Sequence, residues 1–471
     1  MRTLASARFV GSTPCRVAIL AALLGASGCA TLRATMGAYD TGPHGIARPQ
    51  QQLRHALARA DFPVALGWRE DDELLRELGV GASSYYAAQF ARSAAVLDSA
   101  ALLADDRITT SVSANALSLI TNDLARPYQP RRTERLFIPY YGMLAYARLE
   151  QWEDAAVEAR RLSALLAQYG VDRTDTERAT HATLHYLAGV VFERAGERDA
   201  SQVSYRLARA LLPQQVDSAR RTGAKGEGDV LVIVERGFVA HRTTEELSVF
   251  LGDSDRDSMR TGDHEWNPTA ASRIAERLSR GIAGSLSSQR GPHGRRRGQG
   301  RNDDDERNGG YWLSVAFPSV RRAERAANEP VVLVDGATVA NARVVSVLDD
   351  ATMADEGRER VALLTRAIVR AVAKYVVTKA VKDNTGDVAG SIANVAASML
   401  ERADVRSWHV LPQEITLVRV HAAAGQRQLQ LALGSETNPI ELGPVTVRAG
   451  TVTIATVRVW QDPVTRVIAA R

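Results

Sequence analysis

The feature that most constrains the fold is a nearly continuous helical pattern in the first half of the chain. From Arg48 to about Pro213, Ala and Leu recur at spacings of three and four residues, and proline is rare. This period places apolar side chains on one face of an α-helix. We therefore expect residues 48–222 to form an all-α domain of paired helices.

Degenerate repeats occur within this helical half. The tetratricopeptide pattern places small residues where paired helices approach and aromatic residues between neighbouring hairpins. Three partial copies align with positions 81, 143 and 189 as equivalents, 62 and 46 residues apart, whereas the ideal spacing is near 34. We expect tetratricopeptide-like hairpins, with a generic helical bundle as the alternative. The matching residues are Val80, Gly81, Phe90, Ser93, Leu97 and Ala100, then Gly142, Tyr146, Trp152, Ala155, Ala159 and Leu162, then His185, Ala188, Gly189, Phe192, Ser201, Tyr205, Ala208 and Pro213.

The composition changes at Gly223, and strand patterns follow. Apolar runs and alternation predict strands at 229–235, 311–317, 330–339, 415–420, 428–433 and 451–459, and helices near 356–382 and 387–402. The run at 330–339 contains Asp335-Gly336, which is typical of a tight hairpin turn. The Arg/Gly/Asp-rich stretch 287–310 has almost no apolar residue and predicts a disordered insertion. The predicted fold class is α+β: an all-α tetratricopeptide-like region followed by an α+β domain over 223–471.

The first 28 residues have the layout of a secretory signal peptide, with arginines, an apolar stretch and then small residues. Cys29 follows Gly28 directly, as in the lipobox of bacterial lipoproteins, so we expect Cys29 to be the lipid attachment site and 29–47 to be the anchor and tether. Ala30 after the cysteine favours the outer membrane, facing the periplasm. Plain secretion is the alternative. Cleavage would remove Cys15 and three arginines and lower the net charge from +5 to +2, which gives no reason to expect a nucleic-acid partner.

Several strings together resemble a family of uncharacterised bacterial lipoproteins with tetratricopeptide-like repeats. They are Thr121–Tyr128, Glu134-Arg135, Tyr140-Tyr141, Ala155–Arg161, Gly226–Phe238 and Ala403–Pro412. The resemblance implies an envelope lipoprotein with a helical repeat half. It implies no established activity and supplies no catalytic residue.

No motif favours catalysis over a structural role. His181 and His185 lie one helical turn apart, but Ala182 replaces the Glu of zinc protease helices, so packing is the favoured interpretation. The run Asp253-x-Asp255-x-Asp257 begins like a calcium loop but lacks its turn glycine and its final Glu. We expect no catalytic residue, no metal and no cofactor.

These observations favour a protein that is not an enzyme. The hypothesis is a lipid-anchored cell-envelope scaffold or assembly factor that binds a protein partner through its helical repeats. Its membrane contact would be the acyl chains on Cys29, and its candidate partner groove would be lined by Tyr140, Tyr141 and Tyr146. The alternative is an envelope enzyme or carrier that acts on cell-wall or lipid material, with its site in the C-terminal α+β domain.

Overall fold

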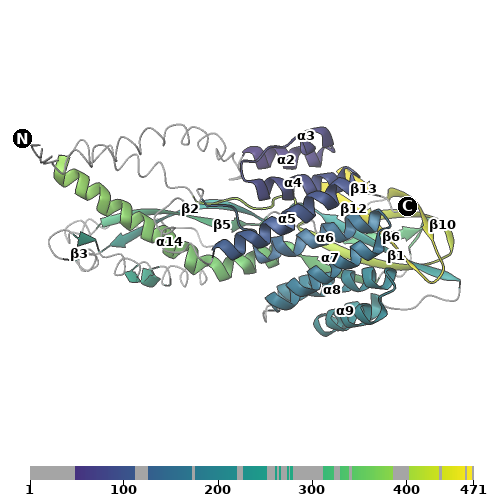
Figure 1. The fold of residues 1–471 in the computed structure, drawn as a ribbon. Coiled ribbons are helices and arrows are strands. Elements are labelled where there is room, and N and C mark those ends of the chain that lie inside the picture. Colours follow the sequence, from purple (N-terminus) through teal and green to yellow (C-terminus); the bar gives the residue numbers. More distant parts are fainter. Residues whose placement is uncertain are drawn as a thin grey trace, which may run out of the picture.

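A computed structural model describes most of the chain from Arg48 onward (Figure 1). The described residues are 48–111, 126–171, 175–219, 226–251, 260–261, 265–266, 273–274, 276–278, 280, 311–322, 329–338, 342–385, 403–433, 438–461 and 464–468. Helices fill the first half and sheets the C-terminal part, which confirms the predicted α+β class.

The helical half is built from consecutive helices that pack in pairs. Three antiparallel pairs, α4 with α5, α6 with α7 and α8 with α9, form the hairpins of the array. The helices are α2 (Arg48–Ala58), α3 (Phe62–Leu66), α4 (Glu73–Tyr86), α5 (Phe90–Ser111), α6 (Arg132–Arg148), α7 (Trp152–Tyr169), α8 (Asp175–Arg194), α9 (Arg198–Leu211) and α10 (Pro213–Ala219).

The three hairpins are closed by the same turn. Ala88, Glu150 and Gly196 each adopt a left-handed backbone, with φ of 60°, 59° and 80°, respectively. In each turn this residue donates its amide to the carbonyl three residues back, and the next amide donates to the carbonyl five residues back. This is the Schellman arrangement, which satisfies the last carbonyls of a helix. The turns are spaced by 62 and 46 residues, as are the copies aligned in the sequence.

Two sheets account for most of the C-terminal part. The five-stranded sheet has the order β13-β12-β1-β9-β8, and the four-stranded sheet has the order β11-β10-β6-β7. Strand β1 pairs parallel with β12 and antiparallel with β9. The strands are β1 (Glu227–Arg236), β2 (His241–Leu251), β3 (Arg260–Thr261), β4 (Glu265–Trp266), β5 (Tyr311–Arg321), β6 (Pro330–Val334), β7 (Ala337–Thr338), β8 (Ala342–Val347), β9 (Glu414–Ala423), β10 (Gly425–Leu433), β11 (Ile440–Val447), β12 (Val452–Gln461) and β13 (Val464–Ile468).

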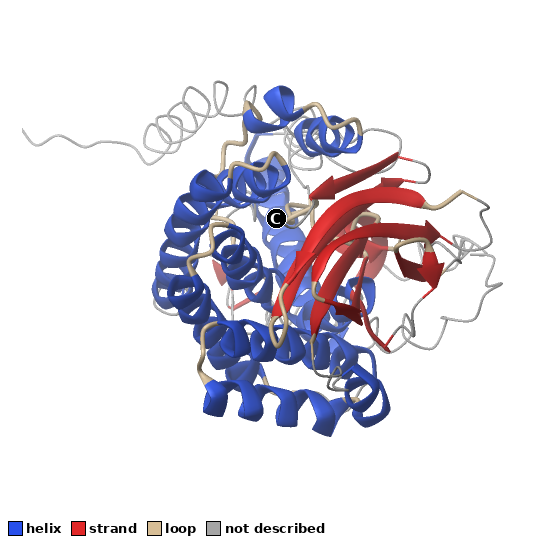
Figure 2. Cartoon of the chain, turned by 90° about the vertical axis from the view of Figure 1, so that its right-hand side faces the viewer, coloured by secondary structure: helices blue, strands red, loops and turns tan. Residues whose placement is uncertain are grey.

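The five-stranded sheet is the middle layer of three. Figure 2 shows the helices wrapped around one side of the sheets. On β1, Leu231 and Ile233 face the helices, whereas Val230 and Val232 face the four-stranded sheet. Because alternate side chains of a strand point to opposite faces, a strand buried on both faces becomes an unbroken apolar run. This apolar run is the reason that the sequence predicted a strand at 229–235, which lies within β1.

The helical part and the sheet share one apolar core. Leu57 and Leu144 from the helices belong to the same cluster as Ile233 and Ile454 from the strands. The change from helix to strand lies between Ala219 and Glu227, close to the boundary predicted at 222. This boundary separates two types of secondary structure but not two cores.

Helix α14 (Leu348–Thr385) continues directly from β8 and runs beside the antiparallel pair of strands β2 and β5 (Figure 1). Its first turn is fixed by Asp349, which accepts hydrogen bonds from the Ala240 amide at 2.6 Å and from Gln413 Nε2 at 2.8 Å. The helix predicted near 356–382 lies within α14. The helix predicted at 387–402 and the insertion at 287–310 lie outside the described residues.

Candidate functional site

Tyr140 and Tyr141 do not line a groove, contrary to the sequence prediction. Both belong to the face of α6 that meets the five-stranded sheet, and each is 0% exposed. The Tyr140 hydroxyl donates a hydrogen bond to Glu235 Oε1 at 2.8 Å. The inner face of the helical array is covered by the chain's own sheet, so these tyrosines belong to the core.

Glu235, on β1, is the centre of a buried polar cluster. Its Oε2 accepts a hydrogen bond from the Tyr86 hydroxyl at 2.8 Å, and the hydroxyls of Tyr86 and Tyr141 lie 2.6 Å apart. Burial raises the pKa of Glu235, while the charge of Arg458 and the tyrosine hydroxyls oppose that rise. The Arg458 guanidinium itself lies 4.3 Å from the ring centre of Trp460. We call Tyr86, Tyr140, Tyr141, Glu235 and Arg458 the Glu235 cluster.

Tyr146, the third residue of the predicted groove, is half-buried and joins two helices. Its hydroxyl donates a hydrogen bond to Asp98 Oδ2 of α5 at 2.7 Å. Burial and the nearby Asp98 raise the pKa of Tyr146. The structure therefore does not bring the three predicted tyrosines together on one accessible surface.

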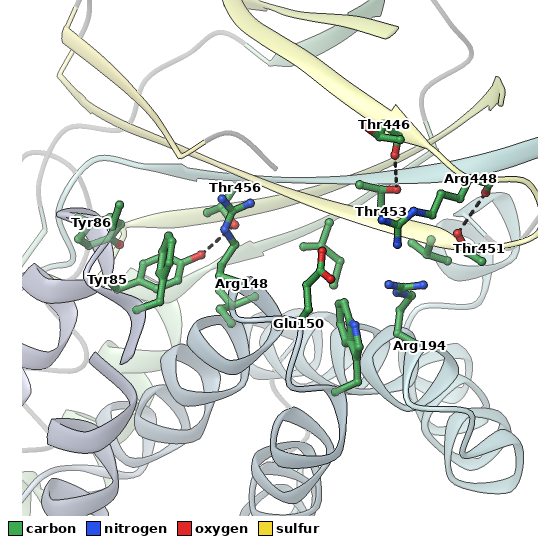
Figure 3. Close-up of a pocket in the computed structure, with 17 residues that line it drawn as sticks. Tyr85, Tyr86, Arg148, Glu150, Arg194, Thr446, Arg448, Thr451, Thr453 and Thr456 are labelled. Carbon is green, nitrogen blue, oxygen red and sulfur yellow. Dashed lines mark hydrogen bonds between the residues drawn. The ribbon is translucent and has the colours of Figure 1, made fainter. Parts of the chain in front are cut away.

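An open cavity of about 480 Å³ lies beside the Glu235 cluster, with Tyr86 in its lining, between the hairpin turns and the β11–β12 turn (Figure 3). The helical wall comes from the α4–α5 and α6–α7 turns and the end of α8. The opposite wall comes from the end of β11 and the first half of β12. We call this cavity the arginine cleft.

Three arginines and one carboxylate line the cleft: Arg148, Arg194, Arg448 and Glu150. Figure 3 shows Arg148 and Arg194 rising from the helices, while Arg448 descends from the strand side toward Arg194. Burial lowers the pKa of Arg194, and the positive charge of Arg448 lowers it further. The lining thus has a formal charge of +2, from three cations and one anion.

Two of these guanidinium groups rest on aromatic rings. The Arg194 Cζ lies 4.4 Å from the ring centre of Trp152, and the Arg148 Cζ lies 5.1 Å from that of Phe90. Stacking of this kind holds the guanidinium plane and leaves its edge for hydrogen bonds. Arg194 Nε is buried and has no hydrogen-bond partner among the described residues.

Threonines form much of the strand wall. The Thr451 hydroxyl donates to the Arg448 carbonyl at 3.1 Å, and the Thr453 hydroxyl donates to the Thr446 carbonyl at 3.0 Å. Thr456 accepts a hydrogen bond from the Tyr85 hydroxyl at 3.0 Å. These bonds fix the wall and leave the oxygens of Thr451 and Thr453 as acceptors.

Cations outnumber anions among the described lining residues of the cleft. Glu150 is the single carboxylate among the described lining residues, and these include no His, Cys, Ser, Asp or Lys. The hydroxyl groups of the lining belong to threonines and tyrosines, and those of Tyr85, Thr451 and Thr453 already donate hydrogen bonds within the chain. Fixed guanidinium groups in a partly desolvated cavity attract carboxylates and phosphates.

The two histidines singled out in the sequence do not line the cleft. His181 and His185 are 5% and 7% exposed, and burial lowers the pKa of His185 to about 4. Across the described part of the chain, no group of three or more His, Cys, Asp or Glu gathers in a metal-binding arrangement, and no helix is long and apolar enough to cross a membrane. Cys29 and the run 253–257 lie outside the described residues, so lipid attachment at Cys29 stays a prediction.

The cleft arginines were missed in the sequence, although a signal was present. Arg148 and Arg194 each end the first helix of a hairpin, and a basic residue at a helix C-terminus has an ordinary explanation in the helix dipole. Their recurrence two residues before each turn was the informative pattern. Neither the comparison with protein-family models nor that with curated proteins gave a match. The resemblance to a lipoprotein family therefore stays a prediction.

Proposed function

We propose that this protein binds, without converting it, a ligand that carries an anionic group, and that the group enters the arginine cleft. The observation that carries this proposal is that Arg148, Arg194 and Arg448 line the cavity, with Glu150 as the one acidic residue among the described lining residues. Guanidinium groups hold carboxylate or phosphate through paired hydrogen bonds. Partial burial strengthens each such bond because the local dielectric is lower than that of water.

The expected protein-binding groove is less well supported by the geometry. A helical repeat array uses its concave face for partners, but here strand residues such as Ile233 and Ile454 pack against that face. The remaining opening at the hairpin turns is the cleft. Its size suits part of a small ligand better than a folded domain.

Titration of the full-length protein with inorganic phosphate in a low-salt buffer, followed by calorimetry, tests this proposal. We expect measurable binding that weakens as salt is added, because exposed charges are screened. Arg448→Gln should weaken phosphate binding by about tenfold, the equivalent of roughly 1.4 kcal/mol. Arg448 is exposed, so this substitution should leave folding intact.

Arg206→Gln is the matched control, since Arg206 is an exposed residue of α9 that does not line the cleft. It should bind phosphate as the wild type does. Absence of phosphate binding by the wild type, or equal weakening by the two substitutions, would rule out the proposed function.

A further inference from the structure

Two cleft arginines occupy the same place in consecutive hairpins. Arg148 lies two residues before the left-handed turn residue Glu150, and Arg194 lies two residues before Gly196. Both turns have the same pair of hydrogen bonds. The backbone therefore presents the two arginines in equivalent ways.

The aromatic supports of these arginines are equivalent as well. Phe90 and Trp152 each begin the second helix of a hairpin, two residues after the turn residues Ala88 and Glu150. Each arginine lies over the aromatic ring of the preceding hairpin. The cleft thus contains the same arginine-on-aromatic unit twice.

The first hairpin does not extend the series. Its equivalent position is Tyr86, whose hydroxyl donates to Glu235 in the core. The series of cationic units therefore comprises two members, and both line the cavity. Figure 3 shows the Glu150 side chain between them, which separates the two cationic positions.

Resting on the proposed function, we infer that the cleft has two anion subsites and that its ligand carries two anionic groups joined by a spacer without negative charge. One group binds at Arg194, where Arg448 faces it from the strand wall (Figure 3). The other binds at Arg148. Because α6 and α8 are in contact and packed helix axes lie about 8–10 Å apart, the two anionic groups should be separated by a similar distance.

The absence of negative charge from the spacer follows from Glu150. A spacer that joins the two subsites passes this carboxylate (Figure 3), so a further negative charge there would be repelled. Hydroxyl or amide donors on the spacer would suit both Glu150 and the acceptor oxygens of Thr451 and Thr453.

Calorimetric titration of the full-length protein with unbranched diacids, from malonate to suberate, tests this inference. Monoacids of the same chain lengths serve as the matched probes. We expect the longer diacids to bind at least tenfold more tightly than their monoacids, while malonate, which is too short to reach both subsites, should show little advantage. Equal affinities of diacids and monoacids at every length would overturn the two-subsite inference.

Two substitutions assign the subsites. Arg148→Gln should abolish the advantage of diacids over monoacids, because only the Arg194 subsite remains. Arg194→Gln should weaken both probes. If either variant fails to fold, as judged by its circular dichroism, the wild-type comparison of diacids with monoacids still decides the inference.

The outcomes also separate this inference from the proposed function. Phosphate and monoacid binding without a diacid advantage would leave the proposed function standing and refute the two subsites. No binding of phosphate, monoacids or diacids would refute both.

Discussion

The helices meet the same face of the five-stranded sheet in two contrasting ways. At β1, Tyr86 and Tyr140 donate hydrogen bonds to Glu235, and Arg458 lies nearby. At the start of β12, three arginines surround an open cavity with one acidic side chain. In the first region the chain supplies the partners of its own buried charge. In the second the described lining has three cations and one anion, and the proposed binding of an anionic ligand is based on this difference.

The same comparison explains why the predicted tyrosine groove is absent. Aromatic side chains with hydroxyl groups suit a core that contains a carboxylate, because each ring fills volume while each hydroxyl satisfies the charge. Tyr140 and Tyr141 have this role. The polar side chains that line the cavity are mostly arginines and threonines, together with Tyr85, Tyr86 and Glu150.

Glu235→Ala should have the largest effect on stability. It removes the acceptor of two buried hydroxyls and leaves Arg458 without its buried counter-charge. We expect the free energy of unfolding to fall by about 3–5 kcal/mol, measured by urea denaturation. Glu441→Ala, at an exposed position of β11, should change it by no more than about 0.5 kcal/mol.

A substitution in the cleft should instead affect ligand binding and leave stability nearly unchanged. Arg448→Ala should leave the free energy of unfolding within about 0.5 kcal/mol of the wild type while weakening phosphate binding. If Glu235→Ala is no more destabilising than Glu441→Ala, or if Arg448→Ala is strongly destabilising, the contrast between the two regions is wrong.

The raised pKa of Glu158 predicts that the free energy of unfolding depends on pH. Burial raises its pKa to about 7, although Arg161 donates to Oε1 at 2.9 Å and opposes the rise. Between pH of about 4.5 and 7 the unfolded chain has released this proton and the folded protein still holds it. The free energy of unfolding should therefore fall as pH rises through this interval, by about 2–3 kcal/mol from this group.

Glu158→Gln tests this contribution, because the amide does not titrate. Urea denaturation at pH 5 and at pH 7.5 should show a smaller loss of stability in Glu158→Gln than in the wild type. Glu153→Gln, at an exposed position of the same helix, should behave as the wild type does. An unchanged pH dependence in Glu158→Gln would contradict the assignment.

Ala155→Leu tests the hairpin packing that holds the helical wall of the cleft. Ala155 is 0% exposed on α7, and its equivalents in the other two hairpins are Ser93 and Ser201, each of which donates to a carbonyl of the paired helix. The larger side chain should cost about 1–3 kcal/mol through overpacking. Ala167→Leu, at an exposed position of the same helix, should cost much less in thermal denaturation. Equal losses would argue against close packing at Ala155.

Substitutions at Glu150 should have the smallest effects on stability, and they separate charge from backbone strain. Glu150→Gly relieves a left-handed conformation with φ of 59° and should stabilise the protein by up to about 1 kcal/mol. Glu150→Gln keeps the strain and removes the charge. Both should tighten phosphate binding to a similar degree, because both remove the one acidic group of the cleft. Tightening by Glu150→Gly alone would show that the turn conformation, rather than the charge, limits binding.

Much of the secondary structure was predictable from local patterns. The apolar run at 229–235 lies in β1, and Asp335-Gly336 forms the turn between β6 and β7 with φ of 53° and 77°. Strand β2 was missed because its sequence includes Arg242, Glu245 and Glu246 and lacks the apolar pattern of a buried strand. It pairs with β5 along its whole length.

The sequence by itself determined the helices of the first half and the apolar strands such as β1, because these depend on the period of neighbouring residues. It also contained the recurrence of an arginine before the turns at Glu150 and Gly196. Only the tertiary structure decided what covers each face. Periodicity does not identify the partner of an apolar face, and the partner of Tyr140 is a strand 95 residues further along the chain. Because that strand packs against α6, the tyrosines are buried in the core. The β11–β12 turn places Arg448 opposite Arg194 in the cleft.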